Sequence, residues 1–405
     1  MISAILWLMA LSAMIAIARL MARRRCQTLT SFETGRLNER YAGRYAAFVT
    51  AAAVAFAALI AIVASNGGRL WPLWSILAGG LVGAFAVWRI KAQFHARKAF
   101  ETAAVAVMAV IAGVAVITTF GIFLTLIVES VLFFNKVPIQ DFLFGRAWSP
   151  QTAIRADQVA SEGAFGVLPL ITGTLLVTGI ALLVAAPIGL MAAIYLETYA
   201  GRRMRDALKL VLELLAGVPT VVYGFFALLI IGPAVSNFAT ALGASFGLTL
   251  DVPAQNALAA GLVMGVMIIP FVSSLSHDVM SAIPPTLREG SYALGATKSE
   301  TILKVILPAA APGLVGAFLL AVSRAIGETM IVVMAASRSA NLTFNPLERV
   351  TTMTVQIVAL LTGDQEFDSA KTLAAFALGL LLFLITLALN VVALLTVKQF
   401  RMRYE

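Results

Sequence analysis

Residues 289–308 read EGSYALGATKSETILKVILP, a polar segment set between apolar stretches long enough to cross a membrane. Pro284 and Pro285 cannot continue a preceding helix, and Thr286 has capping-box spacing to Glu289, so a short helix is predicted to begin there. A polar helical segment in this position is suited to docking onto another protein.

A second short helix is predicted within the same stretch. Gly295 can end the first helix, because glycine permits a turn that other residues resist. Thr297 and Glu300 repeat the Thr-x-x-Glu pattern and start the second helix, which is predicted to end at Pro308. The sequence therefore predicts a hairpin of two helices that meet at an angle.

Composition identifies the surroundings of this hairpin as a membrane. Hydrophobic residues make up 60% of the chain and charged residues only 12%, which excludes a soluble globular domain. A transmembrane helix needs about 20 mostly apolar residues. The stretches that meet this length predict an all-α integral membrane protein with spans at 2–20, 46–64, 71–90, 103–128, 167–196, 210–235, 256–276, 310–336 and 372–397.

The distribution of the 29 lysines and arginines predicts the orientation of the chain. Most of them fall in alternate loops that would share one side of the membrane, and basic loops face the cytoplasm. The amino terminus is therefore expected outside, and the carboxyl terminus and the hairpin inside. The net charge of +9 reflects this topology and does not indicate nucleic-acid binding, because the basic residues are scattered over short loops.

The hairpin resembles the EAA loop of ABC importer permeases. In that loop a Glu, two small residues, a Gly six positions after the Glu, and a closing Leu-Pro have fixed spacing. The matching positions here are Glu289, Gly290, Ser291, Gly295, Leu307 and Pro308. The resemblance implies that the loop at 277–309 couples the chain to a cytoplasmic ATPase. An ordinary cytoplasmic loop between two spans is the alternative.

Two charged residues lie inside the predicted span at 310–336. Arg324 and Glu328, in SRAIGETM, each cost about 2.5 to 3.5 kcal/mol at the centre of a membrane. Their spacing would place both on one face of a helix. From the chemistry alone, two interpretations stay open: an ion pair that fixes helix packing, or an anion path in which the arginine contacts the oxygens of a tetrahedral oxyanion.

Further motifs resemble the phosphate-specific branch of these permeases, and within it the C-type (PstC) family in a long form. They are RAIGETM, the following NPLERVTTMT, DFLFGRAWSP at 141–150 and FGVLPLITGTLLVT at 165–178. The resemblance implies a type I ABC importer domain with a MetI-like six-helix core at 101–405. It also implies that Arg324 and Glu328 line the phosphate pathway. An amino-terminal extension at 1–100 would add three transmembrane helices, whose role the resemblance does not give.

The resemblance also implies the partners. They are a cytoplasmic ATPase dimer that uses ATP and magnesium, a second permease subunit of the A type, and a periplasmic or extracellular phosphate-binding protein. The chain would be a non-catalytic subunit of a bacterial cytoplasmic (inner) membrane. It has no Gly-rich phosphate loop of the G-x-x-x-x-G-K-[ST] kind, so ATP would be hydrolysed by a separate subunit and no cofactor bound by this chain is expected. No metal site is expected either, because His277 and His95 are the only histidines and too few ligands stand at suitable spacing.

Two other functions remain as alternatives. One is a permease for another oxyanion, such as sulfate, molybdate or a phosphonate. The other is a multi-span membrane enzyme or sensor, for which intramembrane His or Asp clusters would be expected. His277 and Asp278 are expected to be solvated at the start of a cytoplasmic loop, and Glu197 is expected to balance the charge of a neighbouring basic loop.

Overall fold

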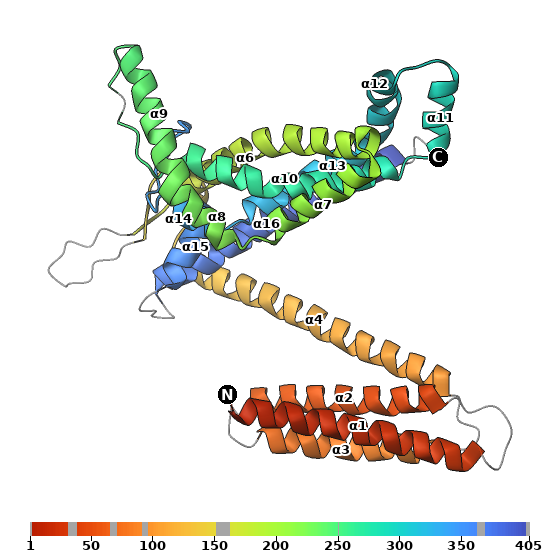
Figure 1. The fold of residues 1–405 in the computed structure, drawn as a ribbon. Helices are drawn as coiled ribbons and strands as arrows, with labels where there is room; N and C mark the ends of the chain where they lie inside the picture. Colours follow the sequence, from red (N-terminus) through yellow and green to blue (C-terminus); the bar gives the residue numbers. More distant parts are fainter. Residues whose placement is uncertain are drawn as a thin grey trace. The chain divides into compact units, whose positions relative to one another are not determined.

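The computed structural model describes residues 2–30, 39–64, 71–90, 96–150, 163–249, 251–362 and 369–401. These residues are mostly helical (Figure 1). The chain forms two compact units, Met1–Ile122 and Phe123–Glu405, and helix α4 (Ala96–Phe134) contains the boundary between them.

The amino-terminal unit contains three helices that pack side by side before α4: α1 (Ile2–Thr30), α2 (Glu39–Ala64) and α3 (Trp71–Trp88). Helices α2 and α3 approach closely at two glycines one turn apart. A Cβ atom on Gly79 would lie 2.0 Å from Val54 Cγ2, and one on Gly83 would lie 2.6 Å from Thr50 Oγ1. This G-x-x-x-G spacing is typical of helix packing in membranes.

The carboxyl-terminal unit adds short elements and long helices to the second half of α4. In chain order they are α5 (Ile139–Phe144), β1 (Trp148–Ser149), β2 (Ala164–Phe165), α6 (Leu168–Ile194), the π-helical turn η1 (Tyr195–Tyr199), α7 (Arg202–Gly217), α8 (Thr220–Phe226), the π-helical η2 (Ala227–Ile231), α9 (Gly232–Ser245), α10 (Ala257–Ser281), α11 (Pro285–Ala293), α12 (Lys298–Thr301), the π-helical η3 (Ile302–Ile306), α13 (Leu307–Ile326), α14 (Met330–Ala335), α15 (Met353–Leu361) and α16 (Ala370–Arg401). The two strands pair antiparallel, with Trp148 opposite Phe165.

Helix α10 is at the centre of this unit, and glycines let α6 pack directly against it. A Cβ atom on Gly261 would lie 2.6 Å from Ile180 Cβ, and one on Gly265 would lie 2.9 Å from the Ala181 carbonyl oxygen. Further along both helices, a Cβ atom on Gly189 of α6 would lie 2.7 Å from Val272 Cγ1, so the carboxyl-terminal part of α10 is also held close to the end of α6. This contact positions Ser273 and His277, which lie on the carboxyl-terminal half of α10.

Seven helices in the described part of the chain are long and apolar enough to cross a membrane: Tyr41–Ala58, Arg97–Phe134, Leu168–Tyr199, Thr220–Ser245, Ala257–Ser281, Lys298–Ile326 and Ala370–Thr396. The last five lie in the carboxyl-terminal unit, and Arg97–Phe134 crosses the boundary between the two units. Of the three predicted amino-terminal spans, α2 is among the seven. Helix α1 is not, and α3 has a shorter apolar stretch at Ser75–Trp88.

Two predicted spans have different limits in the structure. The span predicted at 210–235 is wrong, because Pro219 separates α7 from α8 and the apolar helix instead covers Thr220–Ser245. Helix α7 is amphipathic and buries none of its residues in this chain. The span predicted at 310–336 is also wrong as one helix, since α13 ends at Ile326.

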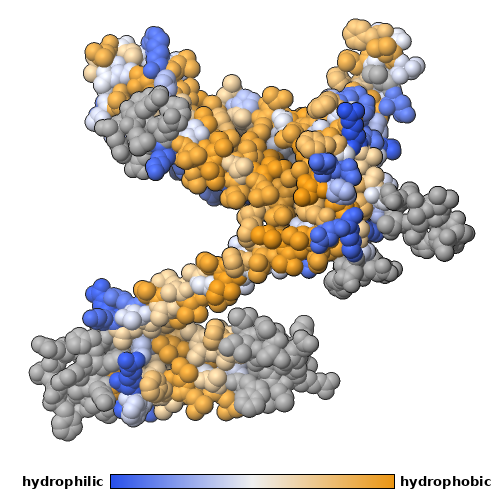
Figure 2. Space-filling model, turned by 180° about the vertical axis from the view of Figure 1, so that it is seen from behind, coloured by the Kyte–Doolittle hydropathy of each residue, from blue (hydrophilic) through white to orange (hydrophobic). Residues whose placement is uncertain are grey.

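The helices carry large apolar side chains on their outer surfaces. Ile117, Leu183 and Leu229 are 70%, 78% and 66% exposed. Apolar side chains cover much of the face that is shown in Figure 2. Such exposure is expected of helices that face lipid or a second subunit and is unusual for a soluble monomer.

Candidate functional site

The hairpin predicted from the sequence is present. Helix α11 ends before Gly295, whose backbone has a φ of +82°. Thr297 and Glu300 then form the predicted capping box: the Glu300 amide donates to Thr297 Oγ1 at 3.3 Å, and the Thr297 amide donates to Glu300 Oε2 at 3.0 Å. The Ser291 and Thr301 hydroxyls lie 2.9 Å apart and connect the two helices.

The exposed face of the hairpin contains most of the residues that match the EAA loop. Glu289, Gly290, Gly295 and Pro308 are exposed, whereas Ser291 and Leu307 are partly buried. Leu294, at the tip of the hairpin, is 91% exposed. An apolar side chain so exposed on a polar hairpin is suited to contact with a second protein.

Two details of the predicted hairpin are wrong. Helix α11 begins at Pro285, and its cap Pro284 offers no side-chain bond, so Thr286 and Glu289 do not form a capping box. Pro308 does not end the second helix either. The π-helical η3 joins α12 to α13, and the Leu307 amide donates to the Ile302 carbonyl five residues earlier. This wider turn lets the helix continue through a residue that lacks an amide hydrogen.

A cavity of about 410 Å³ lies between α7, α10 and the last turn of α13. Its lining is polar on α10 and carries charges of both signs. The polar and charged residues that line it are Lys209, Glu213, Ser273, Ser274, His277, Asp278 and Arg324. Of the two residues predicted to line an anion path, Arg324 lines this cavity and Glu328 does not.

Arg324 presents its guanidinium group to the cavity without an acidic partner among the described residues. The guanidinium carbon lies 5.4 Å from the centroid of the Phe271 ring, a cation–π arrangement that orients the group and does not use its N–H donors. Arg324 is therefore available to bind an oxyanion through parallel N–H···O bonds.

Hydroxyl groups on α10 extend this donor set. Ser273 is 1% exposed and lines the cavity, and its Oγ atom forms no hydrogen bond in the described part of the chain. A buried hydroxyl without a partner can donate to an anion that enters the cavity. Lys209, Ser273 and Arg324 thus supply donors for an oxyanion, while the carboxylates of Glu213 and Asp278 line the same cavity and oppose its binding.

Glu328 lies in the turn between α13 and α14, so the predicted pairing with Arg324 on one helical face is wrong. Gly327 caps the end of α13, and Glu328 Oε1 accepts hydrogen bonds from the amides of Met330 at 3.1 Å and Ile331 at 3.5 Å. The carboxylate thus satisfies the first amides of α14. The Thr354 hydroxyl, on α15, donates to the Glu328 carbonyl oxygen at 2.9 Å.

A second group of charges was missed by the sequence reasoning. Arg288 Nη2 of α11 lies 3.1 Å from Glu197 Oε1 of η1, and His277 Nδ1 of α10 lies 3.4 Å from Glu197 Oε2. The side chains of His277 and Glu197 are only 15% and 14% exposed, so the expectation that His277 is solvated is wrong. The residues come from distant parts of the sequence, and no local pattern could have paired them.

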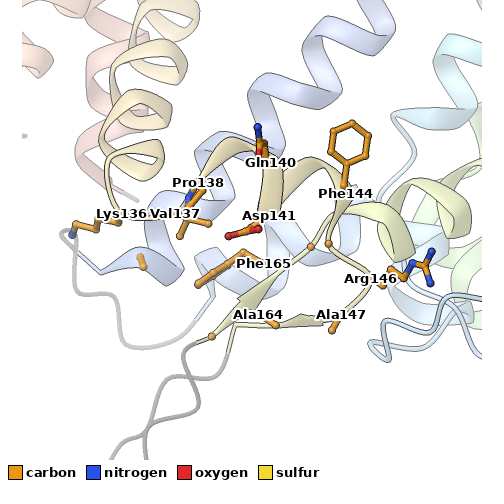
Figure 3. A pocket seen from close by; sticks show the side chains of 14 residues that line it. Lys136, Val137, Pro138, Gln140, Asp141, Phe144, Arg146, Ala147, Ala164 and Phe165 are labelled. Atoms are coloured by element: carbon orange, nitrogen blue, oxygen red, sulfur yellow. The ribbon is translucent and has the colours of Figure 1, made fainter.

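A separate cavity of about 930 Å³ lies beside α5 and the two strands (Figure 3). Its charged lining residues are Lys136, Asp141 and Arg146. Lys136 and Arg146 lie at opposite ends and their side chains point away from each other. The cations therefore do not converge on one ligand, and this cavity lacks the chemistry of the first.

A family model provides the decisive comparison. The model described as "Binding-protein-dependent transport system inner membrane component" matches residues 185–403, which include the hairpin, the cavity and Arg324. The chain belongs to this family. Membership confirms the expected permease fold, with its six-helix core after the extra amino-terminal helices.

Individual relatives refine the comparison. A probable ABC transporter permease protein of Bacillus subtilis, YqgH, is 36% identical over 252 residues, which cover 62% of this chain and 75% of that protein. The phosphate transport system permease protein PstC 1 of Mycobacterium tuberculosis is 34% identical over 274 residues, which cover 62% of this chain and 80% of that protein. The corresponding PstC of Haemophilus influenzae is 36% identical, with 58% and 76% covered.

Solved structures are more distant. A bacterial ABC transporter that imports the acidic polysaccharide alginate shares 15% identity with the chain at a TM-score of 0.44, and the match covers 57% of this chain and 79% of that one.

Proposed function

We propose that the chain is the C-type permease subunit of an ATP-driven importer of inorganic phosphate. The observation that carries the proposal is Arg324, whose guanidinium has no acidic partner in the part of the chain that the structure describes and lies at a cavity between α7, α10 and α13, in a permease whose relatives are named as phosphate permeases. Lys209 and Ser273 supply further donors there. A planar guanidinium fork matches the tetrahedral arrangement of phosphate oxygens better than a point charge does.

The proposed partners follow from the same family. A cytoplasmic ATPase dimer would bind the hairpin of α11 and α12 and use ATP and magnesium there, while this chain itself catalyses no reaction and binds no cofactor. A second, A-type permease would cover the exposed apolar surface of the core, and a phosphate-binding protein would deliver the anion from outside. Glu328 is proposed to stand on the same pathway, next to the last turn of α13.

The transport cycle is proposed to alternate access to the cavity. ATP binding would close the two ATPases, and the hairpin would pass that movement to α10 and α13, the helices that line the cavity. In the proposed orientation the hairpin is cytoplasmic and the amino terminus is outside. An epitope inserted after Leu294 should be labelled only after the membrane is permeabilised, and one at 337–341 should be labelled in intact cells. The reverse labelling would contradict this orientation.

The experiment that tests the substrate is uptake by purified transporter in liposomes. The chain would be reconstituted with its ATPase, its second permease and its binding protein, and uptake of labelled phosphate measured with and without enclosed ATP. We expect ATP-dependent uptake that unlabelled phosphate suppresses. If sulfate, molybdate or a phosphonate is imported with its own binding protein while phosphate is not, the importer serves that anion instead.

A further inference from the structure

The group around Glu197 connects the hairpin to the cavity: Glu197 lies outside the EAA-like loop at 277–309, and its partners His277 and Arg288 lie within it. Glu197 lies in η1, the π-helical turn at the end of α6, where the Ala200 amide donates to the Tyr195 carbonyl at 2.8 Å. The wider turn carries the carboxylate between α10 and α11. Arg288 and His277 contact its two oxygens, one oxygen each.

A third contact holds the backbone of the same residue. Arg205 Nη2, from α7, donates to the Glu197 carbonyl oxygen at 3.2 Å. Four elements therefore meet at Glu197: η1, which carries it, α7, α10 and the hairpin helix α11. Of the hairpin's charged side chains, Arg288 is the one whose described ion pair crosses to another part of the unit. The pair of Lys304 and Glu300 stays within the second helix.

His277 lies between the cavity and Glu197. Its ring lines the cavity that contains Arg324, and its Nδ1 atom faces Glu197. The chain of contacts therefore runs from the cavity through His277 and Glu197 to Arg288 on the hairpin. The step from Glu197 to Arg288 is a hydrogen-bonded ion pair, whereas His277 Nδ1 lies 3.4 Å from Glu197 Oε2 and forms no hydrogen bond among the described residues.

Burial decides whether this chain of contacts can transmit movement. The side chains of Glu197, His277 and Arg288 are 14%, 15% and 28% exposed, whereas both members of the Arg97–Glu101 pair on α4 are more than half exposed. Pairs exposed to water are weak and easily replaced by solvent. A mostly buried pair resists separation, because separation leaves an uncompensated charge.

We propose that Glu197 is a positioning residue that locks the hairpin to α6 and α10, so that movement of the ATPases reaches the cavity. This inference rests on the proposed function of the chain as an importer permease. Without the lock, the hairpin would still bind the ATPases but would move independently of α10. The expected defect is therefore ATP hydrolysis without transport.

The test is the number of anions imported per ATP hydrolysed, measured in proteoliposomes for Glu197→Gln, Arg288→Gln and the double variant. We expect each single variant to lower this ratio about fivefold, and the double variant to be no worse than either, because two partners of one contact are not additive. Arg288→Lys, which keeps the charge, should recover most of the ratio. Arg97→Gln removes a similar but exposed pair and should keep the parental ratio.

A second readout does not depend on the substrate. Spin labels at Leu294 and Tyr199, which are 91% and 48% exposed, report the distance from the hairpin tip to η1. The distance distribution should broaden in Glu197→Gln and in Arg288→Gln, and not in Arg97→Gln. Absence of phosphate uptake by the parental transporter would refute the proposed substrate while leaving this readout intact. The lock would be overturned if both Gln variants kept the parental number of anions imported per ATP and an unchanged distance distribution. An additive loss in the double variant would also overturn it.

Discussion

Replacing Gly295 by valine tests whether the hairpin turn is needed for ATPase binding. Gly295 has a φ of +82°, in the left-handed region that residues with a Cβ atom avoid. A Cβ atom built there meets no atom within 4 Å, so no steric clash adds to the cost. The cost of Gly295→Val is then conformational, at about 2 kcal/mol for a β-branched residue.

This cost converts into a binding effect. Since about 1.4 kcal/mol is a factor of ten, 2 kcal/mol lowers the equilibrium constant for the native turn about thirtyfold. If only the native turn binds the ATPase, the apparent affinity falls by up to that factor. Gly295→Asn should lose much less, because asparagine tolerates the left-handed conformation. The assay is titration of the purified permease complex in detergent with the ATPase subunit.

The chain offers a matched control for this substitution. Gly247, in the turn after α9, has a φ of +71° and equally open surroundings. Gly247→Val therefore carries a similar conformational cost away from the hairpin, and it should leave ATPase affinity unchanged. Equal affinities for Gly295→Val and the parental protein would refute the reasoning, and so would an equal loss in Gly247→Val.

Three other substitutions test separate parts of the account. Arg324→Gln should lower phosphate uptake about tenfold or more at an unchanged protein level in the membrane, since a charge-assisted bond contributes about 1.5–3 kcal/mol, and Arg324→Lys should be partly active. Uptake normalised to the immunoblotted protein measures both variants. Uptake at the parental rate by Arg324→Gln would remove Arg324 from the pathway. Glu328→Ala should destabilise the protein by about 1 kcal/mol, because the α14 amides lose their acceptor, whereas Glu328→Gln keeps an acceptor. Thermal unfolding in detergent compares the two variants, and equal stabilities would contradict the capping role. Gly79→Ala should lower the free energy of unfolding by about 1–3 kcal/mol, because the added methyl group overpacks against Val54. Gly80→Ala should lower it far less, because a Cβ atom there has its nearest contact at 3.8 Å. Similar unfolding temperatures for the two variants would refute the close packing of α2 and α3.

Local sequence chemistry predicted the parts of the fold that depend on neighbouring residues. The capping box of Thr297 and Glu300 and the turn at Gly295 form as expected, because each requires only residues a few positions apart. The long apolar helices of the carboxyl-terminal unit were found for the same reason. The predicted limits of these helices differ from the observed limits where proline or glycine interrupts an apolar run, as at Pro219 and Gly327.

The site depended on tertiary packing, and there the sequence was less informative. Arg324 was identified because a charge in an apolar stretch is costly, but its companion Glu328 was predicted on the same helix, whereas it lies in the turn between α13 and α14. Both Gly327 and the amides of α14 decide the position of that carboxylate. The contact of Arg288 with Glu197 joins residues 91 positions apart. Only the packing of α6 against α10 brings these two residues together.

Uptake of labelled phosphate into proteoliposomes shows whether this permease carries phosphate and whether Arg324 is needed for it. The parental complex and its Arg324→Gln variant would be compared at equal protein, with ATP enclosed and loaded phosphate-binding protein outside. The account predicts ATP-dependent phosphate uptake by the parental complex and a loss of about tenfold or more in the variant, with ATPase binding unchanged in both. Phosphate uptake at the parental rate by Arg324→Gln, or no phosphate uptake by a parental complex that imports another anion, would contradict it.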